Sequence, residues 1–248
     1  MKQWMLLQKK GNQWQSSRAT LAAVHALLLN TSSEMFDDAT TSITLGDKTL
    51  SVDDNAMAKG TGYLQRTWNQ ESITPELGKV SVRTDREHPV IGACYWQYWT
   101  TIDSVETAGS GLMVSRQYFH QPTTAGEFAE PVTASNPVRL GERITVRVTI
   151  TTDRMLDFVH VSDQRPAAFE PANVGERYRW QQSVKWMESP RDESTEFFFQ
   201  HLQKGTVLIE YDLFATQNGC FSTGATTVEC AYAPEWRAQC TGTKIGVR

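Results

Sequence analysis

The sequence lacks the features expected of a secreted precursor, a membrane protein or a protein that binds duplex nucleic acid. The N-terminus has no long apolar stretch followed by a small-residue cleavage site, so we expect no secretory signal in these residues. The longest apolar stretch, at 21–29, is shorter than the roughly 20 residues of a membrane-spanning helix. The net charge of −4 offers no general attraction for nucleic acid. A packed globular structure is the remaining expectation.

The familiar catalytic motifs are missing as well. The sequence contains no Gly-Xaa-Ser-Xaa-Gly elbow, no P-loop, no dinucleotide-binding glycine pattern and no His-Glu-Xaa-Xaa-His zinc motif. The five histidines are scattered, and no spacing of cysteine and histidine fits a zinc site. The sequence therefore predicts no catalytic residue, no metal site and no cofactor. A hydrolase on a β scaffold is disfavoured because no pair of nucleophile and base is visible.

Cysteine is scarce, and none of its four copies forms a Cys-Xaa-Xaa-Cys pair. The four cysteines are Cys94, Cys220, Cys230 and Cys240. They are either buried thiols or contribute one disulfide bond in an oxidising compartment. If one bond forms, Cys220 with Cys240 is the predicted pair, because Gly219 and Gly242 lie beside them and would let the chain bend.

The N-terminal residues are typical of short amphipathic helices. After a first short piece, Ser16 or Ser17 can cap a second helix that ends at Asn30. The apolar positions of this second helix recur at helical spacing and are Leu21, Val24 and Leu28. Two short helices cannot bury their own apolar faces. We therefore expect them to be the remnant of a larger helical domain, and the chain to be a piece of a longer protein.

Beyond residue 33 the pattern favours short strands separated by turn residues. In the first half the predicted strands are a hairpin at 43–52 that turns at Gly46-Asp47, followed by 63–68, 80–82, 91–102 and 112–118. Bulky residues on both faces of 91–102 predict that this strand is covered on both sides. A proline-rich segment at 121–137 is the predicted linker. In the second half the predicted strands are 143–150, 158–161, 177–186, 196–199, 206–216 and 226–232.

The second half predicts an antiparallel β-sandwich. Strict alternation of apolar and polar residues at 143–150 indicates a strand with one buried face. The predicted core residues are Ile144, Val146, Val148, Ile150, Phe169, Val207, Ile209 and Leu213. The fold class is thus mainly β: a C-terminal antiparallel β-sandwich, a second and smaller β-rich domain, and a short N-terminal helical remnant.

Eight segments of the second half stand in an order that resembles a known family. They are RITVRVTI at 143–150, DFVHVSD at 157–163, RPAAFEP at 165–171, FFF at 197–199, KGT at 204–206, EYDLFAT at 210–216, GCF at 219–221 and ECAYAPE at 229–235. This order resembles the C-terminal macroglobulin-like domain of bacterial alpha-2-macroglobulins. The helix at 15–29 resembles the last helices of the family's helical thioester domain, and residues 34–120 resemble the closing half of its CUB-like domain.

The resemblance implies a domain organisation and a function. The implied domains are 1–33 as a helical remnant, 34–122 as a CUB-like domain and 123–248 as the macroglobulin-like sandwich. The family traps proteases: a bait region is cut, and a thioester in a Cys-Xaa-Glu-Gln motif acylates the attacker. None of the four cysteines here begins that motif. The chain is then a non-catalytic C-terminal part of a broad-spectrum protease inhibitor of the cell envelope, periplasmic or surface-bound, whose parent is a lipoprotein.

One functional position follows from the same resemblance. In thioester-bearing members a Met-Tyr pair before a proline-containing turn shields the thioester from water, and the matching residues here are Ala231 and Tyr232. The tyrosine is kept and the methionine is not. Tyr232 is therefore predicted to contact the helical thioester-type domain, or else to be a strand-end tyrosine with a structural hydrogen bond. The eight tryptophans motivate a different hypothesis, an adhesive or carbohydrate-binding β-sandwich of a cell-surface protein.

Overall fold

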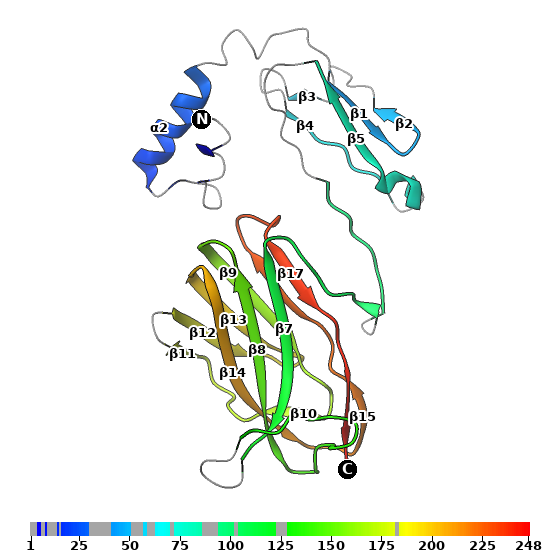
Figure 1. Cartoon of the computed structure of the whole chain (residues 1–248), viewed down its shortest axis with the longest axis vertical. Coiled ribbons are helices and arrows are strands. Elements are labelled where there is room, and N and C mark those ends of the chain that lie inside the picture. The colour runs from blue at the N-terminus through cyan, green and yellow to red at the C-terminus, as the bar shows by residue number, and fades with distance from the viewer. Residues whose placement is uncertain are drawn as a thin grey trace. The chain divides into compact units, whose positions relative to one another are not determined.

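A computed structural model of the chain describes residues 4–5, 8, 14, 16–29, 41–50, 57–58, 63–69, 72–85, 94–101, 104–122, 128–181 and 184–248 (Figure 1). The chain divides into two compact units, one formed mainly by residues 15–95 and the other mainly by residues 96–248. Each unit is described by itself below. No helix within the described ranges is both long and apolar enough to cross a membrane.

The predicted N-terminal helix is present as α2 (Ser17–Leu29). The Ser16 hydroxyl accepts a hydrogen bond from the Ala19 amide at 3.1 Å, which identifies Ser16 as the N-cap. The predicted end at Asn30 lies outside the described residues. Within α2 only Ala23 is buried, whereas Leu21 is 72% exposed. The helix thus presents apolar side chains that its own unit does not cover.

A small antiparallel sheet of order β2-β1-β5 forms the rest of the first unit. Its strands are β1 (Thr41–Leu45), β2 (Lys48–Leu50) and β5 (Val80–Thr84), preceded by the short helix η2 (Pro75–Gly78). The strands β3 (Met57–Ala58) and β4 (Tyr63–Leu64) pair separately. The predicted hairpin is confirmed within 43–50, where Gly46 turns the chain with a φ of +57°.

The long strand predicted at 91–102 is wrong for the residues that the structure describes. Residues 94–101 carry no strand, and Trp99 is 98% exposed, so the segment is not covered on both faces. Residues 65–68, also predicted as strand, are not strand either. Aromatic residues favour a strand only where a neighbouring strand supplies hydrogen bonds and side-chain contacts. Within the described ranges neither segment has such a neighbour.

The second unit is the predicted antiparallel sandwich, built from two main sheets (Figure 1). The four-stranded sheet, in the order β10-β14-β8-β7, contains β10 (Phe169–Pro171), β14 (Gly205–Ala215), β8 (Arg143–Thr152) and β7 (Leu112–His120). The seven-stranded sheet, in the order β11-β12-β13-β9-β16-β17-β6, contains β11 (Arg177–Gln181), β12 (Val184–Pro190), β13 (Ser194–Leu202), β9 (Leu156–Gln164), β16 (Thr226–Cys230), β17 (Arg237–Cys240) and β6 (Ala108–Gly109). The remaining pair is β15 (Gly219–Ser222) and β18 (Lys244–Val247).

The core between the two sheets is the predicted one. The alternating residues of β8 bury one face completely, and Ile144, Val146, Val148 and Ile150 are each 0% exposed. From β10 and β14, the side chains of Phe169, Ile209 and Leu213 are buried as predicted, and Val207 is partly buried against them. Burial of apolar area between the layers is the main stabilising contribution of this unit.

Two predicted boundaries need correction. Residues 112–120 were assigned to the domain 34–122, but β7 pairs with β8 from Leu112 opposite Thr152 to His120 opposite Ile144. This strand therefore belongs to the sandwich, and the boundary lies before Leu112. The described part of the predicted linker belongs to the same unit, since Phe119 bridges to Pro131.

Two predicted strands also differ from the observed ones. The segment 177–186, predicted as one strand, is divided between β11 and β12, which pair with Arg177 opposite Glu188. The strand predicted to run to residue 232 ends at Cys230, because the chain turns there. In both cases the chain reverses direction inside the predicted segment, which the local sequence pattern did not indicate.

A buried ion pair joins the two sheets. Arg116 of β7 and Asp163 of β9 are in contact at 2.6 Å, and their side chains are 2% and 0% exposed. The Asp163 carboxylate also accepts hydrogen bonds from the hydroxyls of Tyr211 and Thr226 at 2.7 and 2.8 Å. Burial, the largest single influence, would lower the pKa of Arg116, but the Asp163 carboxylate together with the neighbouring Tyr118, Tyr211 and Cys240 raises that pKa, so the guanidinium stays charged.

Candidate functional site

The candidate site is the connection between β16 and β17, residues 231–236, which we call the Tyr232 turn. Its backbone is fixed by three internal hydrogen bonds: Ala233 to the Cys230 carbonyl at 3.1 Å, Trp236 to the Ala233 carbonyl at 2.9 Å, and Cys230 to the Trp236 carbonyl at 3.0 Å. Pro234 lacks an amide hydrogen and stops the strand pairing from continuing. The turn is thus a closed loop with a defined shape.

Strand β9 holds the turn from the side. The Ala231 amide donates to the Phe158 carbonyl at 2.9 Å, and the Cys230 thiol donates to the Asp157 carbonyl at 3.0 Å. The Phe158 ring meets the Tyr232 ring edge to face, with centroids 5.1 Å apart and an interplanar angle of 89°. This is a favoured geometry for two aromatic rings. Two residues that are 74 positions apart in sequence therefore form one aromatic pair.

The last residue of the turn, Trp236, fixes its far end. The Arg154 guanidinium lies 3.8 Å from the centroid of the Trp236 ring, and Asp153 binds the same guanidinium at 2.8 Å. Gly111 lies so close beneath this ring that an added Cβ would stand 2.0 Å from it. Trp236 thus supports the turn while Tyr232 points away from the core.

The two predicted site residues, Ala231 and Tyr232, are both exposed, and the Tyr232 side chain is 52% exposed. Among the described residues the Tyr232 hydroxyl has no hydrogen-bond partner. A strand-end tyrosine with a structural hydrogen bond would have its hydroxyl occupied within this unit. The geometry favours a ring that is held in place while its hydroxyl remains available.

The predicted disulfide is not formed in this structure. All four cysteines are described, and all four are free thiols: Cys94 and Cys220 are exposed, and Cys230 and Cys240 are buried. Cys220 lies on β15, opposite Gly246, whereas Cys240 lies on β17, opposite Thr226. The two cysteines belong to different sheets. Burial raises the pKa of the Cys230 thiol, so the cysteine next to the Tyr232 turn is not a reactive thiolate.

Other polar groups on the seven-stranded sheet do not form a nucleophilic site. Glu196 accepts hydrogen bonds from the His160 imidazole at 2.5 Å and from the Ser162 hydroxyl at 2.9 Å. The second ring nitrogen of His160 faces Glu229 at 3.6 Å. The hydrogen bond to Glu196 raises the pKa of His160 and favours its charged form, which is the wrong form for a general base. Within the described ranges no group of three His, Cys, Asp or Glu residues could hold a metal ion.

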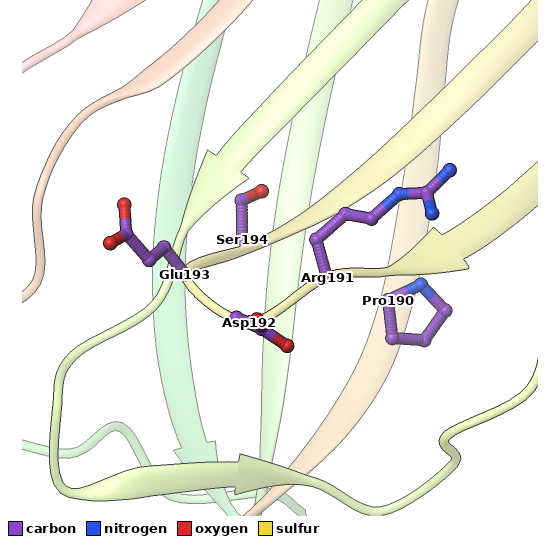
Figure 2. A pocket seen from close by; sticks show the side chains of 5 residues that line it. All are labelled: Pro190, Arg191, Asp192, Glu193 and Ser194. Carbon is purple, nitrogen blue, oxygen red and sulfur yellow. The ribbon is translucent and has the colours of Figure 1, made fainter.

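An open hollow of about 550 Å³ lies at the connection between β12 and β13 (Figure 2). It is lined by Pro190, Arg191, Asp192, Glu193 and Ser194. The side chains shown in Figure 2 spread away from one another, and all come from one short segment. Such a surface lacks the converging polar groups of a small-molecule site.

Tryptophans within the sandwich do not form a shared platform. Trp186 is 3% exposed in the core, Trp236 at the end of the Tyr232 turn is partly buried against the core, and Trp180 is 75% exposed on β11. Carbohydrate recognition by stacking needs exposed rings that lie together. The arrangement in this unit gives that hypothesis no support.

Comparisons with known proteins agree with this architecture. A sequence profile described as the bacterial alpha-2-macroglobulin MG10 domain matches residues 111–235, about half of the chain. No match was found among characterised proteins. A solved structure of Escherichia coli alpha-2-macroglobulin activated by porcine elastase has a TM-score of 0.50 and 14% identity, and the match covers 96% of this chain and 21% of that chain.

Two further solved structures of bacterial alpha-2-macroglobulins match with lower scores. Native Escherichia coli alpha-2-macroglobulin from domain MG7 to the C-terminus gives a TM-score of 0.47 and 17% identity, covering 59% of this chain and 25% of that chain. A mutant of Salmonella alpha-2-macroglobulin gives 0.46 and 20%, covering 58% of this chain and 10% of that chain. The chain thus spans from about a tenth to a quarter of the length of these proteins.

Proposed function

Because this chain belongs to the bacterial alpha-2-macroglobulin family, we propose that it acts as the C-terminal part of a protease-trapping inhibitor of the cell envelope. In this proposal the chain catalyses nothing and carries no acylating group, because none of its cysteines begins a Cys-Xaa-Glu-Gln motif. Its partners are proteases, which it meets only as part of the full-length protein. The role of this region is to present the Tyr232 turn to the helical thioester-type domain.

The observation that carries the proposal is the exposed but fixed Tyr232 ring. The matched region 111–235 includes residues 231–235 of the turn. The Tyr232 residue is 52% exposed, yet its ring is packed against Phe158, and the amides of its two chain neighbours, Ala231 and Ala233, are hydrogen-bonded. A rigid aromatic ring with a free hydroxyl can cover a reactive bond, exclude water from it and still find a hydrogen-bond partner there.

Thiol release from the full-length protein tests this proposal. We expect Tyr232→Ala to speed spontaneous loss of the thioester in the absence of protease, because water then reaches it. Tyr178→Ala is the matched control, since Tyr178 is a 64% exposed tyrosine of the same sheet and lies on β11, the edge strand. We expect this control to release thiol at the wild-type rate. Equal rates in both variants and the wild type would refute the proposed shielding role.

The isolated chain provides a second test. Mixed with trypsin or elastase, it should form no covalent adduct, because the acylating motif is absent. A protease-linked band on a denaturing gel that survives reduction would contradict the proposal. A hydrolase assay on the same sample should give only the buffer rate.

A further inference from the structure

Phe158 has a backbone conformation that its side chain does not favour. Its φ is +56°, and among the described residues it is the one non-glycine residue with a positive φ. In this left-handed region the Cβ of a bulky residue crowds its own backbone, and such residues persist only where surrounding structure holds them. The position lies inside β9, not in a loop.

The fold needs the left-handed residue but not the phenyl ring. Val161 and Val159 are buried with the regular spacing of two residues, but the next buried residue is Leu156, three positions away. The alternation of buried and exposed side chains along β9 therefore shifts by one residue between 159 and 156. The paired strand β13 shows the same one-residue shift opposite this point, since its buried residues Phe199 and Leu202 are also three positions apart. A glycine would allow this change without strain.

Burial in the core does not explain the choice of phenylalanine. The Phe158 side chain is 43% exposed, in contrast to Phe197 and Phe199 of the neighbouring strand, which are 0% and 1% exposed. The aromatic contact of the Phe158 ring is the edge-to-face pair with Tyr232. The carbonyl of the same residue accepts the Ala231 hydrogen bond. Both the ring and the backbone of Phe158 therefore act on the Tyr232 turn.

We propose that Phe158 is a positioning residue for Tyr232: its ring holds the tyrosine ring at a fixed angle above the turn, and its strained backbone conformation places it there. A ring that is already oriented loses less conformational entropy when it docks. The purpose of this positioning rests on the proposed function, in which Tyr232 covers a thioester. The positioning itself is a property of this chain and is tested on the chain alone.

Hydrogen exchange of the Tyr232 turn, measured on the 248-residue chain, tests the contact. We expect Phe158→Ala to speed exchange of the Ala231 and Ala233 amides by roughly 2- to 10-fold, the range given by loss of one edge-to-face aromatic pair. Phe158→Tyr keeps the ring and should restore wild-type exchange. Phe198→Ala is the matched control, because Phe198 is 38% exposed on the adjacent strand, and it should leave the turn unchanged.

Coupling between the two rings separates positioning from a general structural role. In a Tyr232→Ala background, Phe158→Ala should produce no further increase in exchange of these amides, because the partner ring is already gone. An equal increase in both backgrounds would overturn the proposal. Unchanged exchange of the Ala231 and Ala233 amides in the single variant Phe158→Ala would also overturn it.

Thermal unfolding tests the strain. At an ordinary strand position alanine is more stable than glycine. At position 158 we expect the reverse order, with Phe158→Gly melting roughly 2–5 °C above Phe158→Ala. Glycine and alanine at Phe198 should show the ordinary order. Alanine melting above glycine at position 158 would overturn the inference. Suppose that the exchange experiments show coupling between Phe158 and Tyr232, but Tyr232→Ala does not change the rate of thiol release from the full-length protein. That result would refute the proposed function and leave the positioning role of Phe158 standing.

Discussion

Replacing Arg116 with methionine removes the cation that lies between the two sheets of the sandwich. The guanidinium contacts Asp163 at 2.6 Å with both side chains almost fully buried. It also donates hydrogen bonds to the carbonyls of Gln164, Thr223 and Gly224. Methionine keeps much of the apolar length of the side chain but none of these interactions.

The magnitude follows from what stays behind in the core. The Asp163 carboxylate retains the hydroxyls of Tyr211 and Thr226, and the three carbonyl groups each lose the hydrogen bond from Arg116. Removing one partner of a buried ion pair destabilises a protein by about 3–5 kcal/mol, because an uncompensated charge stays buried. For a unit of this size that corresponds to a fall of about 10–20 °C in melting temperature.

Arg143 offers a control with the same contact distance in a different environment. It also pairs with an aspartate at 2.6 Å, but its side chain is 45% exposed and that of Asp212 is 21% exposed. Exposed ion pairs are worth about 0–1 kcal/mol, so Arg143→Met should lower the melting temperature only slightly.

Thermal unfolding is followed together with hydrogen exchange of β7, β9 and β14, which reports on the sandwich alone. A loss below about 1 kcal/mol for Arg116→Met, or equal losses for Arg116→Met and Arg143→Met, would refute the reasoning that burial decides the value of the pair.

Three further predictions concern a titrating pair, a packed glycine and the thiols. Because the hydrogen bond to Glu196 raises the pKa of His160, the stability from this pair is complete below the unfolded value of 6.5 and is lost as pH rises through the folded-state pKa. The melting temperature should therefore fall over that range, and fall less in His160→Gln. Gly111→Ala should lower the urea midpoint more than Gly141→Ala, since both glycines have positive φ but only Gly111 touches Trp236; equal shifts would contradict this packing. The two exposed cysteines should react with dithionitrobenzoate in the native chain and the two buried ones only after unfolding. One reactive thiol in the native chain and two after unfolding would restore the predicted Cys220–Cys240 disulfide.

The parts of the fold that the sequence predicts well are set by local chemistry. Ser16 caps α2 through a hydrogen bond within one helical turn, and the alternation along β8 reports directly which side chains face the core. The strand expected at 91–102 shows the limit of such patterns, since residues 94–101 have aromatic side chains but no strand. A strand forms only where another strand pairs with it, and that partner can be distant in the sequence, so a local pattern does not reveal it.

The assignment of β7 was wrong for the same reason. Its pairing with β8 spans a proline-rich connection, and the composition of such a connection resembles that of a domain linker. The Arg116–Asp163 pair was not predicted at all, because its two residues are 47 positions apart and meet only when two sheets stack.

The candidate site combines a position that sequence resemblance identified with a contact that it did not. Tyr232 stands before a proline-containing turn, and that local pattern marked it in advance. Phe158 carried no such signal, because nothing in Asp157-Phe158-Val159 indicates a left-handed residue, and the apolar pattern favours an ordinary strand. Only the folded chain places the two rings 5.1 Å apart. A strained and half-exposed phenylalanine would be a poor choice for stability alone, and its contact with Tyr232 makes that choice consistent with the proposed role of the turn, in which one ring is presented in one orientation.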